Sequence, residues 1–225
     1  KVADKLSSLF KNERDNYNKY WDDINPFIKY GCMRDEKFYD RVKNFIIFKN
    51  LDDEYITLDE YLDRNKDKHE NQVFYVSDKD QQSQYIRLFK ENDLDAVYLD
   101  NIIDTHFISF LEMKRQPVKF KRVDAEISES LKESQDKDKS NKKIDKALEK
   151  LFKEAIDKDK LKIRVEGLKN ADLPAMILLS EESRRMEEMM ARFGDMGINY
   201  TPPKEETLVL NRNSDLIKSL VELSK

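Results

Sequence analysis

Gln72-Val-Phe-Tyr-Val-Ser77 and Ala96-Val-Tyr-Leu99 are the two stretches that decide the fold. Both are short apolar runs rich in β-branched and aromatic residues, and such runs predict buried strands. Asp78 to Lys90 lies between them and has apolar residues at helical spacing, so we expect a helix there. Strand, helix, strand at this spacing is typical of a parallel pair joined by a right-handed crossover.

The same alternation continues downstream. We expect Asp104 to cap a helix with an apolar face, and Val118 to Val123 to form a third strand. The apolar residues of this expected helix are Phe107, Phe110 and Leu111. Residues 69–123 therefore predict a small three-layer αβα unit with a parallel sheet.

Residues 1–68 have mainly helical periodicity and predict a helical connector. Pro26 should start or kink a helix, and Gly31 is expected to stop one. Ile47-Phe48 is a short expected strand. Thr57-Leu-Asp-Glu60 matches a capping box, in which Thr57 binds a free backbone N–H and Glu60 reaches back.

Residues 124–141 consist largely of Ser, Lys, Asp and Glu, and we interpret them as a solvated linker. Residues 142–225 predict a second αβ unit. Its expected elements are a helix at 144–156, strands at 161–165, 175–179 and 207–211, and a helix at 216–223. The fold class is therefore α/β (α+β), with a helical connector, an αβα unit and a second αβ unit.

The composition excludes several classes of function. The 42 basic and 46 acidic residues are interspersed and give a net charge of −4, so no basic surface for nucleic acid is indicated. No apolar run approaches the ~18 residues of a membrane span. Four glycines, with no phosphate-binding loop, and two histidines, His69 and His106, without further ligands at suitable spacing argue against a nucleotide or metal site. The single cysteine, Cys32, excludes an internal disulfide and fits a cytoplasmic protein.

A methionine-rich stretch lies between Ser180 and Gly197. On a helix, four of its residues recur at i, i+3, i+4 and i+7 and form one apolar face. They are Met186, Met189, Met190 and Phe193. Methionine is flexible and polarizable, and adaptable binding surfaces use it heavily. The same pattern is also typical of the core face of a surface helix, so both interpretations remain open.

Several stretches together resemble the heat-shock-protein-90 chaperone family, especially its bacterial form. Those that resemble the helices of its middle domain are Tyr20–Asp23, Phe27–Gly31 and Asp35–Tyr39. Those that resemble its small αβα subdomain are Phe74–Ser77, Leu99–Asp104 and Phe120–Asp124. Those that resemble its C-terminal domain are Ser183–Met190 and Glu206–Asn211. The similarity follows the order of the family over nearly the whole chain.

This resemblance implies that the chain is a piece of a longer protein, which fits Lys1 at its start. Residues 1–123 would be the rear of the middle domain. Residues 142–225 would be most of the C-terminal domain, truncated before the dimerisation helices. The full-length protein would be a homodimeric, ATP-driven chaperone that uses ATP and magnesium, whereas this chain would hold no cofactor and would not be an enzyme. The expected partners are partly folded client proteins and the seventy-kilodalton heat-shock chaperone system, without nucleic acid or membrane.

In the family, an amphipathic helix of the C-terminal domain and an aromatic-containing helix of the middle domain contact clients. The matching residues are Met186, Met189, Met190, Phe193, His106, Phe107 and Phe110. Bacterial members can carry Trp at the position of His106. The histidine found here in its place weakens the aromatic anchor. Phe107 and Phe110 are also plausible core residues.

Two other functions remain open from the sequence. One is an architectural module that relays domain motion and assembles dimers without binding clients. The other is an α/β enzyme with a small ligand at the ends of the strands Val73–Val76 and Ala96–Leu99, where open parallel sheets bind ligands. The chain has no phosphate loop, nucleophile set or metal set, so the enzyme is the weakest of the three hypotheses.

Overall fold

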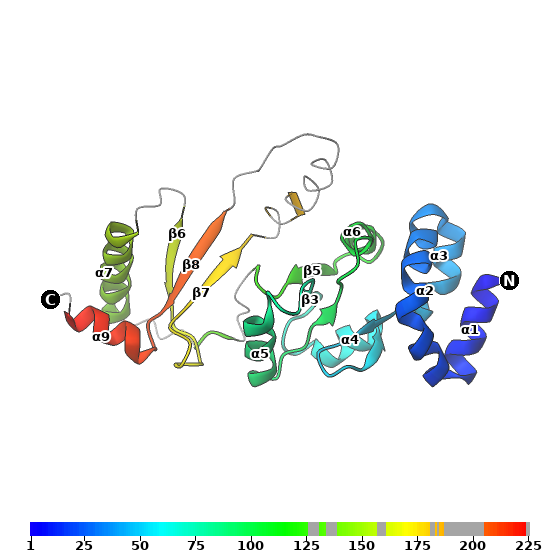
Figure 1. Ribbon diagram of the computed structural model, residues 1–225, viewed down its shortest axis with the longest axis horizontal. Helices are drawn as coiled ribbons and strands as arrows, with labels where there is room; N and C mark the ends of the chain where they lie inside the picture. The colour runs from blue at the N-terminus through cyan, green and yellow to red at the C-terminus, as the bar shows by residue number, and fades with distance from the viewer. Residues whose placement is uncertain are drawn as a thin grey trace. The chain divides into compact units, whose positions relative to one another are not determined.

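The structure is a computed structural model that describes residues 1–125, 131–133, 139–156, 161–180, 183, 185–186 and 205–223. The chain folds as two compact units, Lys1–Val123 and Asp124–Lys225. In Figure 1 the first unit runs from blue to green and the second from green to red.

The first unit begins with helices that pack through aromatic side chains. The ring of Tyr17 lies edge-on to Phe10, with 5.5 Å between centroids, and is also 5.5 Å from the ring of Trp21. Tyr17 and Trp21 are almost fully buried, because α2 lies against both α1 and α3. The bounds of these helices are α1 Val2–Asn12, α2 Arg14–Arg34 and α3 Glu36–Val42, followed by a 3₁₀ turn, Lys43–Phe45.

Pro26 lies inside α2 and does not start a helix. A proline has no N–H, so the carbonyl of Asp22 loses its usual partner four residues later. The side chain of Asn25 replaces that partner, since its Nδ2 donates to the Asp22 carbonyl at 3.0 Å and to the Trp21 carbonyl at 3.1 Å. Local side-chain chemistry thus lets the helix continue through the proline.

The expectation that Gly31 ends the helix was wrong, because α2 continues to Arg34. A Cβ at residue 31 would lie 3.0 Å from Cε1 of Phe38, so the glycine allows α3 to approach α2 closely. The helix ends at Asp35, whose carboxylate accepts the N–H of Phe38 and caps α3.

A β-hairpin follows these helices. The short strand at Ile47-Phe48 is confirmed as β1 (Ile47–Lys49), which pairs antiparallel with β2 (Tyr55–Thr57), a strand that the sequence did not reveal. The capping box is also confirmed, since the hydroxyl of Thr57 accepts the Glu60 N–H and the Glu60 carboxylate accepts the Thr57 N–H. It begins α4, Leu58–Asn65.

The predicted parallel αβα unit is present. Its strands follow the order β4-β3-β5, and β3 pairs parallel with both neighbours. Helix α5 begins later than expected, because the Asp78 carboxylate accepts the N–H groups of Asp80 and Gln81 and holds a turn before it. The bounds are β3 Gln72–Val76, α5 Ser83–Glu91, β4 Val97–Tyr98, α6 Asp104–Lys114 and β5 Lys119–Arg122.

The central strand β3 is buried on both faces. Val73 and Tyr75 belong to the same core cluster as the inner residues of α6. On the opposite face, the ring of Phe74 meets the ring of Phe89 from α5 at 5.0 Å. A near-continuous apolar run is typical of such a strand, since helices cover both sides of a parallel sheet.

The second unit contains a mixed sheet in the order β6-β8-β7. Strands β6 and β8 are parallel, whereas β7 and β8 are antiparallel. Helices α7 and α9 contribute Leu148 and Ile217 to a core that includes Val165 and Leu210 of the sheet. The bounds are α7 Lys139–Ala155, β6 Lys162–Glu166, β7 Ala175–Leu179, β8 Glu206–Asn211 and α9 Asp215–Leu223.

The expected linker is not solvated throughout its described part, since Asp124 and Leu131 are both buried. Leu131 is only 3% exposed, and the bridge between Lys132 and Leu168 attaches this stretch to the second unit. A buried leucine stabilises such an attachment by removing apolar surface from water.

Candidate functional site

The outer face of α6 carries an exposed, partly apolar stripe. Ile102 is 78% exposed and Met113 is 63% exposed, and the exposed residues His106 and Ser109 lie between them in sequence. Their spacing places all four on one side of the helix and of the turn that precedes it. We call these four residues the α6 stripe.

The inner face of α6 belongs to the core. Phe107 is 1% exposed and shares a core cluster with Ile108 and Leu111. Phe107 is therefore a packing residue of the first unit, and it is not available as a client contact. Phe110 is half-buried, with its ring 5.0 Å from the ring of Tyr39 in an edge-on arrangement.

The methionine-rich stretch is described only in part. Ser183, Arg185 and Met186 are helical, and Met186 is 38% exposed. Three of the expected contact residues lie outside the described residues, namely Met189, Met190 and Phe193.

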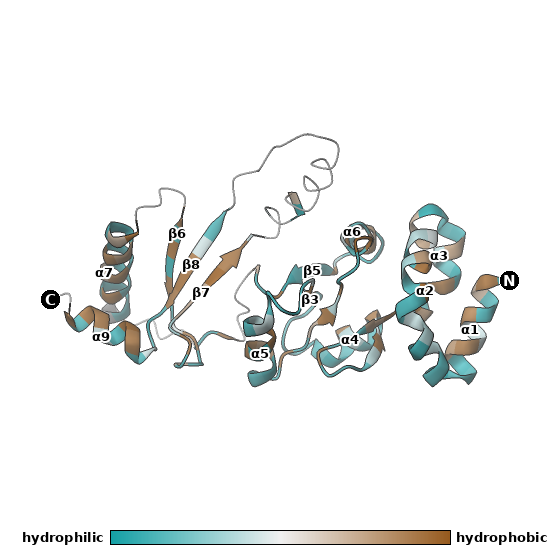
Figure 2. Cartoon of the chain, viewed as in Figure 1, coloured by the Kyte–Doolittle hydropathy of each residue, from teal (hydrophilic) through white to brown (hydrophobic). Residues whose placement is uncertain are grey.

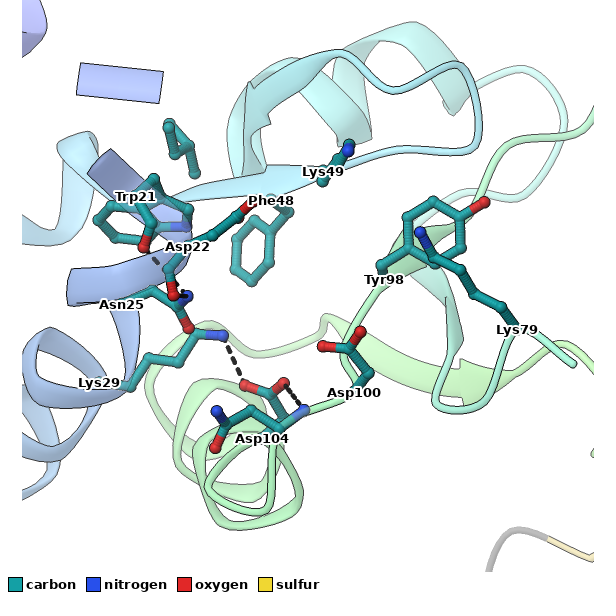
Figure 3. A pocket seen from close by; sticks show the side chains of 12 residues that line it. Trp21, Asp22, Asn25, Lys29, Phe48, Lys49, Lys79, Tyr98, Asp100 and Asp104 are labelled. Atoms are coloured by element: carbon teal, nitrogen blue, oxygen red, sulfur yellow. Dashed lines mark hydrogen bonds and ion pairs between the residues drawn. The ribbon is translucent and has the colours of Figure 1, made fainter. Parts of the chain in front are cut away.

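A pocket of about 260 Å³ lies at the carboxyl ends of β3 and β4 in the first unit. Figure 3 shows side chains from α2, from the β1 strand and from the loops after β3 and β4 facing this space. The residues that line it are Trp21, Asp22, Asn25, Lys29, Ile47, Phe48, Lys49, Lys79, Tyr98, Asp100, Asn101 and Asp104.

A buried ion pair forms the floor of this pocket. Lys29 of α2 and Asp104 of α6 meet at 2.5 Å, with side chains 5% and 4% exposed. The other oxygen of Asp104 accepts the N–H of Asn101 at 3.0 Å. Asp104 was expected to cap α6, but it is the first residue of the helix and its carboxylate instead joins α6 to α2.

Burial and nearby carboxylates raise the pKa values of two tyrosines near the pocket. Tyr55 donates its hydroxyl to Asp22 at 2.6 Å, and burial followed by this hydrogen bond raises the pKa of Tyr55. Burial also raises the pKa of Tyr98, and the charge of Asp53 adds to that effect.

The described residues offer little for covalent or metal chemistry. Burial raises the pKa of the Cys32 thiol to about 12, which keeps it in the unreactive thiol form. Within the described ranges, no group of three His, Cys, Asp or Glu side chains is placed to hold a metal ion. What the first unit offers instead is a polar pocket beside an exposed apolar stripe.

Comparison with known proteins identifies the family. The family model described as Hsp90 protein matches residues 1–225. The chain belongs to the Hsp90 family. It is 32% identical over 231 residues to chaperone protein htpG of Bacteroides fragilis strain YCH46, covering 98% of this chain and 34% of that protein. It is also 32% identical over 238 residues to chaperone protein HtpG of Porphyromonas gingivalis strain ATCC 33277, covering 100% of this chain and 34% of the relative.

This Hsp90 chain therefore spans about a third of the length of these relatives. Among solved structures, it is similar to the middle domain of a putative heat shock protein of Plasmodium falciparum, with 18% identity and a TM-score of 0.44 over 54% of this chain and 52% of that one. No helix in the described part of the chain is long and apolar enough to cross a membrane.

Sequence reasoning selected His106 but missed Ile102 and Met113 of the α6 stripe. A signal for Met113 was present, because the apolar residues of α6 are not confined to the face that holds Phe107 and Leu111. An apolar residue outside the core-facing stripe of a helix is a candidate for exposure. Only the packed structure shows that Phe107 points inward while Met113 is exposed.

Proposed function

We propose that this Hsp90 chain binds partly folded client proteins and couples them to the ATP-driven cycle of a longer, dimeric chaperone. The observation that carries the proposal is the α6 stripe, where Ile102 and Met113 leave apolar surface in contact with water next to His106. Partly folded clients offer apolar segments that gain free energy when such surface is covered. The exposure of Met186 supports a second contact of the same kind in the C-terminal unit.

The chemistry of these side chains suits varied clients. Methionine has three rotatable side-chain bonds and repacks against irregular surfaces, so Met113 and Met186 can accommodate different sequences. A few exposed apolar residues give modest affinity, which permits release during a chaperone cycle. Rigid support comes from the inner face of α6, where Phe107 is fully packed.

ATP and magnesium would act elsewhere in the longer protein. The turn after β3 and the loop after β4 present Asp78, Asp80 and Asp100, together with Asn101, and neither segment contains a glycine. Carboxylates at these positions repel phosphate, so these residues do not fit the nucleotide. We accordingly propose that this chain alone has no ATPase activity, that the whole protein is a cytoplasmic homodimer, and that it cooperates with the seventy-kilodalton chaperone system.

Suppression of aggregation tests client binding. The chain should slow the aggregation of a thermally unfolding enzyme without nucleotide, followed by light scattering. Replacing Ile102 and Met113 by serine should weaken this protection, while circular dichroism shows an intact fold. Val2→Ser is the matched control, because Val2 is 60% exposed on α1, outside the α6 stripe.

A second set of substitutions tests the proposed client contact in the C-terminal unit. Polar replacement of Met186, Met189 and Met190 should reduce protection further when combined with the α6 substitutions. If neither set of substitutions changes protection, the surfaces are structural only. If the parent chain gives no protection at all, the architectural alternative, a module that relays motion without client affinity, replaces the proposal.

A further inference from the structure

Some of the charged side chains that line the pocket at the carboxyl ends of β3 and β4 form no ion pair. We propose that it binds the guanidinium group of an arginine side chain in a client segment, an inference that rests on the proposed client-binding function. The pocket would then select clients in which a basic residue lies close to apolar ones.

The charges that line the pocket do not balance after pairing. Lys29 pairs with Asp104, and Lys49 pairs with Asp53 at 3.0 Å. The carboxylates of Asp22 and Asp100 form no ion pair among the contacts of the described residues, although the charge of Asp22 helps to raise the pKa of Lys49. A single further cation, Lys79, reaches the pocket wall. The lining itself holds three lysines and three aspartates, and an excess of one negative charge arises only because Lys49 pairs with Asp53 outside the lining. That excess attracts a cation.

The two carboxylates come from opposite walls. Asp22 projects from α2 and already accepts the Tyr55 hydroxyl on one oxygen, while Asp100 follows β4 and is exposed. In Figure 3 the Asp100 carboxylate points into the space between Phe48 and Asp104. A guanidinium presents five N–H donors in a flat fork, so it can bond carboxylates on two sides, which a compact ammonium does less well.

Aromatic side chains supply the other part of an arginine site. Trp21, Phe48 and Tyr98 line the pocket, and flat cations stack on such rings. Lys79 already places its ammonium 4.0 Å from the centroid of the Tyr98 ring, so an arginine that stacks there has to displace it. Trp21 and Phe48 are each 3% exposed and offer only a small part of their rings. The volume of about 260 Å³ is below the ~300–1,000 Å³ of small-molecule sites and suits one long side chain.

An anionic ligand fits less well. The positive N-terminal end of α6 would attract an anion, but Asp104 occupies its first position and lies in the pocket floor. The lysine closest to that end, Lys29, is held by Asp104. A phosphate would therefore meet carboxylates where it needs N–H donors.

The pocket is continuous with the α6 stripe along the chain. Asp100 and Asn101 line the pocket, and the next residue, Ile102, begins the stripe. An extended client segment advances about 3.3 Å per residue, so an arginine in the pocket places neighbouring apolar residues within reach of Ile102. One segment can thus use both features.

Trp21 provides a reporter for this pocket, because it is the single tryptophan of the chain and lines the cavity. The experiment titrates the full chain with a short capped peptide of apolar residues and one arginine, and repeats the titration with citrulline or lysine in place of arginine. Binding is followed by peptide anisotropy, and pocket occupancy by Trp21 fluorescence. We expect the arginine peptide to bind most tightly of the three. We also expect a strong change in Trp21 fluorescence with the arginine peptide and not with the other two.

The decisive variant is Asp100→Asn, which removes one charge with little change in shape. It should weaken binding of the arginine peptide about three- to tenfold, as expected for a partly exposed charge-assisted hydrogen bond, and leave the citrulline peptide unchanged. Asp23→Asn is the matched control, because Asp23 is an exposed carboxylate on the same helix as Asp22 and does not line the pocket.

The outcomes separate this inference from the proposed function. Equal binding of arginine and citrulline peptides, reduced by Ile102→Ser and Met113→Ser, would overturn the pocket and keep the client surface. A Trp21 response to arginine that survives those serine substitutions would support the pocket and count against the stripe. If no peptide binds, both proposals fail.

Discussion

The sheets of the two units are covered differently. In the first unit, β3 is the central strand, and helices α5 and α6 bury Val73 to Val76 from both faces. In the second unit, β7 lies at the edge of the sheet, and Ile177 is 47% exposed although its neighbours Met176 and Leu178 are 5% and 4% exposed. Figure 2 shows β7 coloured as hydrophobic along its length, so its exposure does not follow from polarity.

The difference follows membership of the core cluster that α7 and α9 form with the sheet, since Leu208 and Leu210 belong to it and Ile177 does not. On the face that meets α7 and α9, Leu210 is fully buried, Leu208 is half-buried and Ile177, which pairs with Leu208, is the most exposed. The first unit thus supports its exposed α6 stripe on a fully packed layer. In the second unit, apolar surface becomes accessible within the sheet itself.

The largest expected effect concerns the attachment of α6 to α2. Lys29→Met would leave the Asp104 carboxylate buried without its cation, at a cost of about 3–5 kcal/mol in the free energy of unfolding. Denaturant unfolding followed by Trp21 fluorescence reports this for the first unit alone, since the second unit has no tryptophan. The first unit should then unfold at a lower denaturant concentration than it does in the parent chain.

Two further variants make this test specific. Lys37→Met changes an exposed lysine on α3 and should leave the unfolding midpoint unchanged. Adding Asp104→Leu to Lys29→Met should restore part of the lost stability, because an apolar pair no longer leaves a charge buried. A midpoint unaffected by Lys29→Met would show that the ion pair does not hold the layers together.

A smaller effect compares adjacent residues of β7. Leu178→Ala removes a buried side chain and should cost about 2–5 kcal/mol, whereas Ile177→Ala should cost about 1 kcal/mol or less because Ile177 is already half exposed. Hydrogen exchange of β8 amides measures both variants locally. Equal losses would mean that Ile177 is covered in solution, and the contrast with β3 would disappear.

The smallest effect is a pH dependence confined to the first unit. His69 is 7% exposed, its Nε2 lacks a hydrogen-bond partner, and burial lowers its pKa. The unfolded chain takes up the proton at about pH 6.5, before the folded chain does, so stability is complete above that pH and is lost as the pH falls through the lower folded pKa. The slope should not exceed about 1.4 kcal/mol per pH unit for one proton.

Unfolding midpoints at a series of pH values between neutral and mildly acidic measure this slope by Trp21 fluorescence. His69→Gln should flatten it, and His106→Gln, which changes an exposed imidazole, should keep the parent's behaviour. A slope that survives in His69→Gln would assign it to another group.

Much of the fold was accessible from local signals. The capping box at Thr57, the strand β3 and the order of the αβα unit depend on residues close together in the chain, and all three are present. Strand β2 was missed because Tyr55–Thr57 is short and its pairing with β1 depends on the turn around Asn50. The stop expected at Gly31 failed because the glycine serves a contact with Phe38, which no local pattern reveals.

The candidate site was accessible only in part. His106 was selected through the family resemblance and Met186 first through its helical spacing, and both are exposed. Phe107 was included among the candidate contacts but is buried, because helical periodicity does not show which side of an apolar helix meets the sheet. The pocket carboxylates Asp22 and Asp100 are 78 positions apart in the chain, and only the tertiary packing, in which α2 lies against α6, brings them to one cavity.

The sequence by itself determined the element order, the parallel αβα unit and membership of the Hsp90 family, because periodicity, capping and family similarity are recorded in the order of residues. The tertiary structure alone decided which apolar side chains face water and which charges remain unpaired in the pocket. The physical reason is that exposure and charge balance depend on neighbours from distant segments, as Ile177 in β7 and Asp100 beside α2 both show.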